Sequence, residues 1–230
     1  MSLLEMKNIK KSFDGQVVLK DISLSVEKGE VLGIIGPSGS GKSTLLRCAT
    51  GLEKQDFGEI KYEGTFGLVF QNFNLFPHYS VMKNITDAPI KVQKRKKEEV
   101  YAEARELLRK MGLEDKEKAY PFQLSGGQQQ RISIARALAM KPDILFFDEP
   151  TSALDPELTE EILKVIRDLA AEHMTMVIVT HEMNFAKNVG TKVIFMDKGV
   201  VVEENTPKEF FESPKEDRAR QFMSSIKWSG

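Results

Sequence analysis

The sequence predicts an α/β fold with a mostly parallel sheet, an N-terminal antiparallel β lobe and a helical insert. Five apolar runs have the length of strands. Several are too continuous for strands with one face in water, which indicates a sheet covered on both faces. Amphipathic helical patterns separate these runs. The predicted strands lie at Val31–Ile35 and at residues 66–70, 144–147, 176–179 and 193–196.

Two apolar patterns with helical spacing predict amphipathic helices. One covers residues 158–169 and follows Asp155 and Pro156, where an aspartate can cap the helix and a proline suits its first turn. The other covers residues 100–111 and stops at Gly112, as a helix with a glycine end would. Each helix should bury one face.

Short strand-like pieces predict the antiparallel lobe. The segments before Val31 have the form of a hairpin, and so do the pieces within residues 59–70, which Glu63 and Gly64 separate. We expect one domain over the whole chain. Its lobe and core should cover about residues 1–80 and 126–230, and its insert about residues 81–125.

The composition excludes several classes of protein. The 230 residues carry 33 basic and 34 acidic side chains, and this balance argues against a nucleic-acid binder. No apolar run approaches the roughly 18 residues that span a bilayer. The single cysteine, Cys48, excludes a disulfide framework and should be a small buried hydrophobic residue. With no secretory leader before the first strand, we expect a reducing, cytoplasmic compartment.

A glycine-rich loop joins the strand Val31–Ile35 to the next helical pattern. Its glycines let backbone N–H groups converge on phosphate oxygens, and the helix start adds positive charge. Lys42 is expected to reach the terminal phosphates and Ser43 to bind Mg²⁺. This predicts the core of a P-loop NTPase, although the loop alone fits a kinase or a GTPase as well. The residues are Gly36, Pro37, Ser38, Gly39, Ser40, Gly41, Lys42, Ser43 and Thr44.

Two acidic residues follow the buried strand at residues 144–147. Asp148 is expected to complete the Mg²⁺ shell, and Glu149 to polarise the attacking water as a general base. A strand-end turn with solvated carboxylates is the alternative, and the phosphate loop makes it less favoured.

An octapeptide before Asp148 makes the sequence resemble the nucleotide-binding subunits of ABC transporters. Ser125 and two glycines at a helix start form a second anion site. The resemblance implies that two copies enclose two ATP molecules, with Ser125, Gly126, Gly127 and Gln128 binding ATP in trans. The octapeptide reads Leu124, Ser125, Gly126, Gly127, Gln128, Gln129, Gln130 and Arg131.

The resemblance assigns further roles. Phe13 should stack on adenine, where the alternative is a core or turn phenylalanine, and Val18 should also contact ATP. Gln71 should touch Mg²⁺ or water, and His181 should hydrogen-bond the γ-phosphate. The catalytic set is then Glu149, His181, Gln71 and Lys42, and the metal ligands are Ser43, Gln71 and Asp148. The homodimer interface should contain Ser152, Ala153, Leu154 and Asp155, although Asp155 also fits a simple helix cap.

Residues 70–78 and 209–214 resemble the polar amino-acid uptake branch of these transporters. This implies a chain on the cytoplasmic face of the membrane that powers a separate permease, and indirectly serves a substrate-binding protein. A permease helix is expected to dock at residues 71–77, where burial of Phe73, Leu75 and Phe76 is the alternative. Residues 51–67 form a shorter span than this branch usually carries.

Other functions stay open at this point. An ATPase of an exporter, or of a lipid or peptide extraction system, would differ mainly outside this chain. A non-transport ATPase of the same family, acting on DNA or ribosomes, usually has long coiled coils or two cassettes, which are absent here. A regulator without catalysis would be expected to lose Glu149 or His181. The basic run at residues 91–97 is expected to be a solvated helix start.

Overall fold

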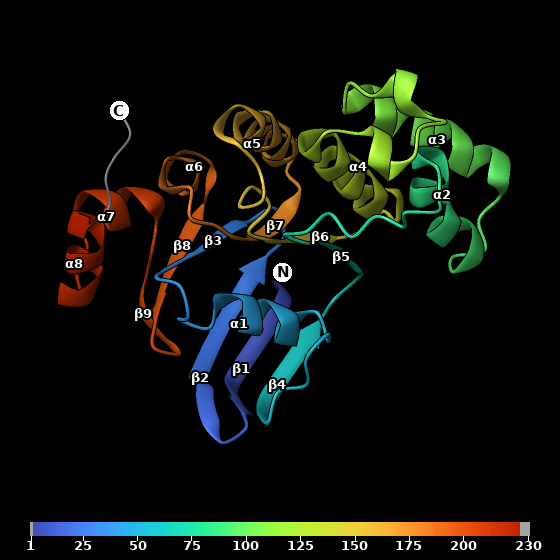
Figure 1. Ribbon diagram of the computed structural model, residues 1–230. Coiled ribbons are helices and arrows are strands. Elements are labelled where there is room, and N and C mark those ends of the chain that lie inside the picture. Colours follow the sequence, from blue (N-terminus) through green and yellow to red (C-terminus); the bar gives the residue numbers. More distant parts are fainter. Residues whose placement is uncertain (1, 226–230) are drawn as a thin grey trace. The chain divides into compact units, whose positions relative to one another are not determined.

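The computed structural model describes residues 2–225, which form two units (Figure 1). The first unit contains residues up to Gly64 and from Glu172 onward, and the second contains Thr65–Ala171. The predicted helical insert, about residues 81–125, falls within the second unit.

An antiparallel sheet occupies the N-terminal part of the first unit. It has the order β2-β1-β4, with β1 at Ser2–Phe13, β2 at Gln16–Glu27 and β4 at Phe57–Tyr62. The predicted N-terminal hairpin is confirmed, because β1 and β2 pair antiparallel up to Phe13 and Gln16. Asp14 and Gly15 turn the chain with φ of 48° and 81°, as a tight two-residue hairpin requires.

The parallel strands of the first unit confirm three predicted elements. In the order β7-β3-β8-β9, strand β3 pairs in parallel with β7 and β8, and β9 is antiparallel to β8. Every residue of β3 and β7 is buried, as the continuous apolar runs predicted. The strands are β3 (Val31–Ile35), β7 (Thr175–Val179), β8 (Lys192–Asp197) and β9 (Val200–Asn205); the helices are α1 (Lys42–Ala49), α6 (Met183–Val189), α7 (Pro207–Glu212) and α8 (Asp217–Ser225).

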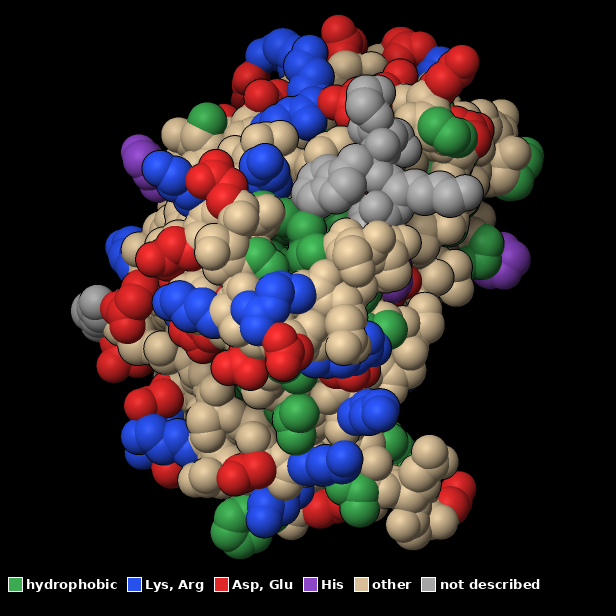
Figure 2. Space-filling model, turned by 90° about the vertical axis from the view of Figure 1, so that its left-hand side faces the viewer, with side chains coloured by type: hydrophobic (Ala, Val, Ile, Leu, Met, Phe, Trp, Pro, Cys, Tyr) green, Lys and Arg blue, Asp and Glu red, His purple; other side chains and the backbone are tan. Residues whose placement is uncertain are grey.

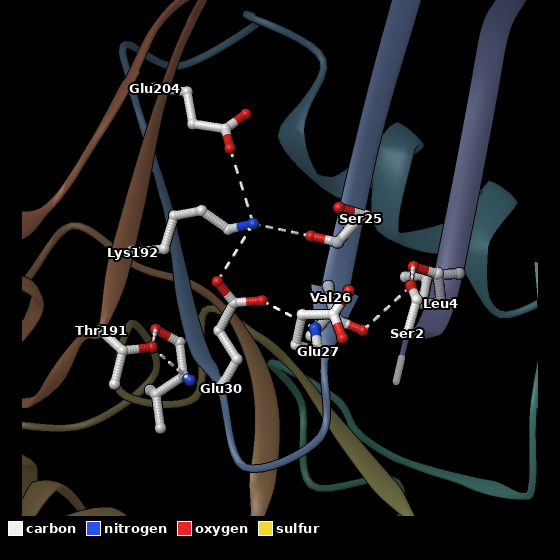
Figure 3. A network of polar contacts seen from close by, with 10 residues as sticks. Ser2, Leu4, Ser25, Val26, Glu27, Glu30, Thr191, Lys192 and Glu204 are labelled. Carbon is white, nitrogen blue, oxygen red and sulfur yellow. Dashed lines mark hydrogen bonds and ion pairs between the residues drawn. The ribbon is translucent and has the colours of Figure 1, made fainter.

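A polar network joins the two sheets of the first unit (Figure 3). The Nζ atom of Lys192, on β8, lies 3.0 Å from Oε1 of Glu30 and 3.5 Å from Oε1 of Glu204. It also donates a hydrogen bond of 2.8 Å to the backbone carbonyl of Ser25, on β2. Because Lys192 and Glu30 are largely buried, removing either partner would leave a charge that has lost its main compensation.

The second unit combines two parallel strands with the longer helices (Figure 1). Strands β5 and β6 pair in parallel, with Val69 opposite Phe147. The helices predicted at residues 100–111 and 158–169 are confirmed as α3 and α5, and the Asp155 carboxylate accepts a hydrogen bond of 3.1 Å from Leu158 N. The elements are β5 (Phe66–Val69), β6 (Ile144–Asp148), α2 (Val81–Lys91), α3 (Lys97–Lys110), α4 (Gly126–Ala139), α5 (Pro156–Ala171) and the 3₁₀ turns Glu114–Lys116 and Pro121–Gln123.

The hairpin predicted within residues 59–70 is wrong. Strand β4 pairs with β1, and β5 pairs with β6. The turn residues do bend the chain, with φ of 96° at Gly64, but the next strand finds its partner elsewhere. Gly67 shows why, because a Cβ atom there would lie 2.8 Å from Leu145 Cδ2 and 3.4 Å from the Ala137 side chain. The close approach of β5 to β6 and α4 therefore outweighs the local turn signal.

Two observations concern the expectations about nucleic-acid binding and membrane spans: the charges on the surface, and the length and apolar character of the helices. On the face seen in Figure 2, Lys and Arg side chains are interspersed with Asp and Glu, as the balanced composition suggests. Among the helices of residues 2–225, none combines the length and the apolar character needed to cross a membrane.

Candidate functional site

The glycine-rich loop leaves β3 and opens α1 in a backbone conformation that only glycine adopts easily. Gly36 has a φ of 148°, and a Cβ atom there would lie 2.1 Å from the carbonyl oxygen of Met196. Gly41, the N-cap of α1, has a φ of 101°. With φ in the left-handed region, a side chain at either position would strain the backbone. The loop is therefore held against β8 and ends in an open helix start.

Polar groups of the loop fit a phosphate ligand. Lys42 is 4% exposed, and its Nζ donates hydrogen bonds of 3.0 Å to the carbonyls of Gly36 and Pro37. The Ser40 hydroxyl is buried and finds no hydrogen-bond partner within the described residues. Ser38 and Gly39 are exposed, and the space beside Gly39 is open to 4 Å. A cationic, open loop with an unsatisfied hydroxyl is suited to an anion.

Neighbouring strands bring Val18 to this loop. Gly199 N donates a hydrogen bond of 3.1 Å to the Ser40 carbonyl, and its own carbonyl accepts one of 2.9 Å from Lys20 N. A Cβ atom on Gly41 would lie 3.2 Å from the Val18 carbonyl oxygen. Val18 therefore lines the start of α1, as its predicted role in binding requires.

Phe13 ends β1 at the hairpin turn. Its ring is 41% exposed, and Lys11 Nζ lies 4.9 Å from the ring centroid. The ring is thus not part of the core, but it does lie at a turn, which was the other half of the alternative interpretation. An exposed aromatic ring offers a stacking face to a base.

His181 follows β7 at the same edge of the sheet as the loop. Strands β3 and β7 are parallel neighbours, with Ile34 opposite Val179, and Thr180 N donates a hydrogen bond of 3.3 Å to the Ile34 carbonyl. The carboxyl ends of adjacent parallel strands share one edge, which is where ligands bind in such sheets. His181 is exposed at this edge.

In the second unit, the predicted acidic pair and Gln71 also share an edge. Gln71 follows β5 by two residues, and the pair begins at the last residue of β6. Asp148 is 6% exposed. Glu149 has a φ of 47°, and its carbonyl accepts hydrogen bonds from Ser152 N at 3.2 Å and Ser152 Oγ at 3.0 Å. Such a conformation costs about 1–3 kcal/mol in a residue with a side chain and is concentrated at functional sites.

Gln130 is a residue of this site that the sequence reasoning missed. Its side chain is fully buried, and Nε2 donates to the Phe70 carbonyl at 3.3 Å and to the Pro150 carbonyl at 2.8 Å. One amide thus joins the loop that contains Gln71 to the loop that contains Glu149. The octapeptide includes Gln130, but its spacing gives no sign of these two distant partners.

The predicted second anion site lies at the start of α4. Ser125 is the exposed N-cap, and its hydroxyl accepts a hydrogen bond of 3.2 Å from Gln128 N. In return, Gln128 Oε1 accepts one of 3.0 Å from Ser125 N, which completes a capping box. The serine hydroxyl is held outward beside the open helix end.

The two glycines after Ser125 have a packing reason besides anion binding. A Cβ atom on Gly126 would lie 3.1 Å from Leu154 Cδ2, and one on Gly127 would lie 3.1 Å from Leu158 Cδ2. The loop of residues 152–155 therefore lies against the start of α4. Ser152, Ala153 and Asp155 are exposed, and Leu154 is half-buried.

The predicted metal ligands all offer oxygen. The Ser43 hydroxyl, the Gln71 amide and the Asp148 carboxylate each offer an oxygen of the kind that Mg²⁺ prefers. Ser43 belongs to the first unit, and the other two residues belong to the second.

Comparisons with known proteins agree with these features. A family profile described as ABC transporter matches residues 19–152. The L-cystine import ATP-binding protein TcyC of Bacillus subtilis (strain 168) is 50% identical over 97% of this chain and 98% of its own length. The L-cystine transport system ATP-binding protein TcyN of Escherichia coli (strain K12) is 52% identical over 98% and 99%.

Solved structures give the same result. The chain superposes on cbiO1 from Clostridium perfringens, part of the ABC transporter complex cbiONQ, with a TM-score of 0.83 and 29% identity over 92% of this chain and 91% of that one. The dimeric bacterial ABC transporter cassette MJ0796 gives a TM-score of 0.79 and 36% identity over 89% and 98%. The matching family profile, the relatives aligned over nearly their full length and the shared fold place this chain in the family of ABC transporter ATP-binding proteins.

Proposed function

We propose that this chain hydrolyses ATP to power a membrane importer for a polar amino acid. The observation that carries the proposal is the identity of about half of all residues, over nearly the whole chain, with proteins named for import or transport of L-cystine and arginine. ABC cassettes hydrolyse ATP, so the chain is an ATPase. No comparison favours an exporter, an extraction system or a non-transport ATPase.

Groups of the first unit hold the nucleotide in this proposal. Lys42 and the backbone N–H groups of residues 38–44 bind the phosphates, while Phe13 and Val18 contact the base and ribose. His181 donates a hydrogen bond to the γ-phosphate. The buried ammonium, the unsatisfied Ser40 hydroxyl and the open space at Gly39 support this assignment.

Groups of the second unit perform the hydrolysis. Glu149 takes the proton of the attacking water, and Gln71 positions that water. Mg²⁺ would be held by Ser43, Gln71 and Asp148, and when bound it neutralises charge on the phosphates. The left-handed backbone of Glu149, fixed by Ser152, supports a role that needs one defined carboxylate position.

Two copies complete the site. We propose a homodimer in which Ser125, Gly126, Gly127 and Gln128 of one copy contact ATP held by the other, with residues 152–155 at the interface. The dimeric state of the MJ0796 cassette supports this arrangement. Closure is favoured because ATP contacts both copies only in the closed state, and hydrolysis removes that difference.

A partner permease would dock on the second unit at the cytoplasmic face of the membrane. An apolar cavity of about 380 Å³ is lined by Phe66, Leu68, Phe70, Phe76 and Arg136, among others. Phe76 is 55% exposed, whereas Phe73 and Leu75 are half-buried, so the expected docking loop is neither fully buried nor fully free. An apolar side chain of a permease helix fits this cavity.

The docking loop is held in place before any partner arrives. Asn84 is 2% exposed; its Oδ1 accepts from Phe76 N at 2.8 Å, and its Nδ2 donates to three carbonyls of residues 76–80. Arg136 donates to the carbonyls of Asn74 and Phe73 at 2.7 and 3.2 Å. Desolvation lowers the pKa of Arg136, although a guanidinium stays charged at neutral pH. Such pre-organisation reduces the entropy lost on docking.

Mixed dimers test the shared site. Lys42→Ala and Ser125→Arg should each abolish hydrolysis alone. Mixing the two chains should restore part of it, because one of the two sites then has an intact Lys42 and an intact Ser125. Phosphate release is measured at several mixing ratios. If no mixing ratio restores activity, the proposed sandwich, a homodimer whose two copies enclose ATP, is contradicted.

A charge at the docking loop tests the permease assignment. Phe76→Asp should leave the ATPase activity of the isolated chain unchanged and abolish co-purification with the permease. Phe57→Asp, which alters an exposed phenylalanine of the first unit, is the matched control. Retained permease binding by Phe76→Asp would contradict this docking surface.

A further inference from the structure

The most exposed large apolar side chain of the described residues lies just before the α4 capping box. Phe122 is 81% exposed, and the neighbouring Tyr120 is 41% exposed. Their rings stack with a centroid distance of 6.0 Å and an interplanar angle of 22°. Such a pair left in water forgoes the gain from burial, which indicates a surface that something covers in the working state.

The backbone holds Phe122 rigidly outward. Pro121 and Leu124 are buried on either side of it. Gln123 Oε1 accepts a hydrogen bond of 2.8 Å from Tyr120 N, and Gln123 N donates one of 2.9 Å to the Tyr120 carbonyl. The backbone that carries the ring is therefore ordered before any ligand binds, which lowers the entropy lost on binding.

The position of Phe122 relative to Ser125 suggests what covers the ring. Ser125 follows Phe122 by three positions, a span of at most about 10 Å at roughly 3.3–3.6 Å per residue. Ser125 is proposed to meet the γ-phosphate of ATP held by the other copy. Phe122 lies in the 3₁₀ turn Pro121–Gln123, immediately before this helix start. The ribose and base of that ATP extend from the triphosphate over a similar length.

We infer that Phe122 of one copy stacks on the adenine of the ATP held by the other copy, with Tyr120 supporting the ring. This inference rests on the proposed sandwich of two copies around ATP. It adds a residue that contacts ATP only when the homodimer is closed. Phe13 would cover one face of the base from its own chain, and Phe122 the other face. Aromatic–base stacking then contributes to closure and not to the first binding of ATP.

The experiment uses the full chain with Glu149→Gln, so that ATP is not consumed. Dimer formation is followed by light scattering as ATP is added. Phe122→Ala should raise the ATP concentration at half-dimerisation roughly 5- to 100-fold, the effect of one lost stacking contact. Phe122→Trp should restore the parental value. Phe57→Ala, which removes another exposed ring, should leave it unchanged.

A base-specific signal separates stacking from a structural effect. The fluorescence of etheno-ATP should be quenched on dimerisation with Phe122 or Trp at this position, and not with Ala. ATP binding to the monomer should be the same in all variants. Dimerisation of Phe122→Ala at the parental ATP concentration would overturn the inference. Loss of permease stimulation with normal dimerisation would also overturn it, and would assign the ring to the permease. A parent that stays monomeric with ATP would overturn the sandwich itself.

Discussion

Two helix starts of this chain are proposed to bind phosphate, and the structure builds them differently. The start of α1 has Gly41 as its N-cap, with no side chain to satisfy the first N–H groups. The start of α4 has Ser125, whose hydroxyl already accepts from Gln128 N in a capping box. The first depends on glycines in left-handed backbone conformations and has no capping side chain, whereas the second is a well-formed helix end without a ligand.

This difference indicates the order in which ATP is bound. The α1 start has no capping side chain and carries the buried Lys42, so a phosphate there would supply acceptors that no cap provides. At the α4 start, a phosphate must compete with the Ser125–Gln128 pair and gains less. We expect ATP to bind first on α1, and α4 to join only when a second copy closes.

The substitution with the largest expected effect removes hydrolysis and leaves both helix starts unchanged. Glu149→Gln should lower turnover by about 10²-fold or more, because an amide cannot take the proton of water. ATP binding and ATP-driven dimerisation should persist, as measured by phosphate release and light scattering. Glu157→Gln, at an exposed carboxylate in the first turn of α5, is the control. Undiminished turnover would remove Glu149 as the base.

A glycine pair tests the strain at the α1 start. Gly36→Ala should lower the free energy of unfolding by about 1–3 kcal/mol more than Gly39→Ala. Both positions have positive φ, but a Cβ atom meets the Met196 carbonyl oxygen at 2.1 Å at Gly36 and nothing within 4 Å at Gly39. Urea unfolding of the two variants measures the difference. Equal stabilities would show that the loop can move away from β8.

Two substitutions at Ser125 separate capping from phosphate binding. Ser125→Ala should cost about 1 kcal/mol of stability through the lost cap. Ser125→Asp should keep that stability, since aspartate caps equally well, but should prevent dimerisation because its charge repels the γ-phosphate. Thermal unfolding and ATP-dependent light scattering report the two effects. If Ser125→Asp still dimerises with ATP, this serine does not face phosphate.

The smallest effect concerns the body of α1. Cys48 is 2% exposed, and burial raises the pKa of its thiol to about 11. The thiol is therefore neutral at physiological pH, and its labelling by a disulfide reagent should be slow and rise about tenfold per pH unit towards pH 11. The urea-unfolded chain serves as the control, because its exposed thiol has an ordinary pKa. Fast labelling of the native chain at pH 7 would mean that α1 opens readily.

Local signals in the sequence predicted much of the structure around the start of α1 and the cap of α5. The run Val31–Ile35 followed by a glycine loop predicts a strand and an open helix start, because every interaction needed lies within about ten residues. The helix cap at Asp155 could be predicted in the same way, and the hydrogen bond from Leu158 N to the Asp155 carboxylate confirms that prediction. Capping, glycine conformations and apolar periodicity all act over such short distances.

Contacts between distant residues could not be predicted in this way. The hairpin within residues 59–70 failed because β5 pairs with β6, which begins about eighty residues further along the chain. Gln130 was missed because its partners, Phe70 and Pro150, lie 60 and 20 residues away. The glycines after Ser125 were predicted as part of an anion site, and their contact with Leu154 and Leu158 emerged only from the fold.

The alignments with relatives bear on the short span at residues 51–67. The alignment with TcyC runs over 243 positions, more than the 230 residues of this chain, so the relative has residues that this chain lacks. In this chain only three residues, Glu63 to Thr65, separate β4 from β5. A connection of three residues agrees with the short span that the resemblance implies for residues 51–67.

The hydrogen bonds of the buried Gln130 amide depend on the distance between the loop after β5 and the loop after β6. The amide spans two loops with bonds of 3.3 and 2.8 Å, and a displacement of about 1 Å on either side would take one bond out of range. A permease is proposed to dock on the loop after β5. Displacement of that loop would lengthen or break a hydrogen bond of Gln130, whose other bond is to Pro150, next to Glu149. Transport and hydrolysis would thereby share one mechanical linkage inside a single unit.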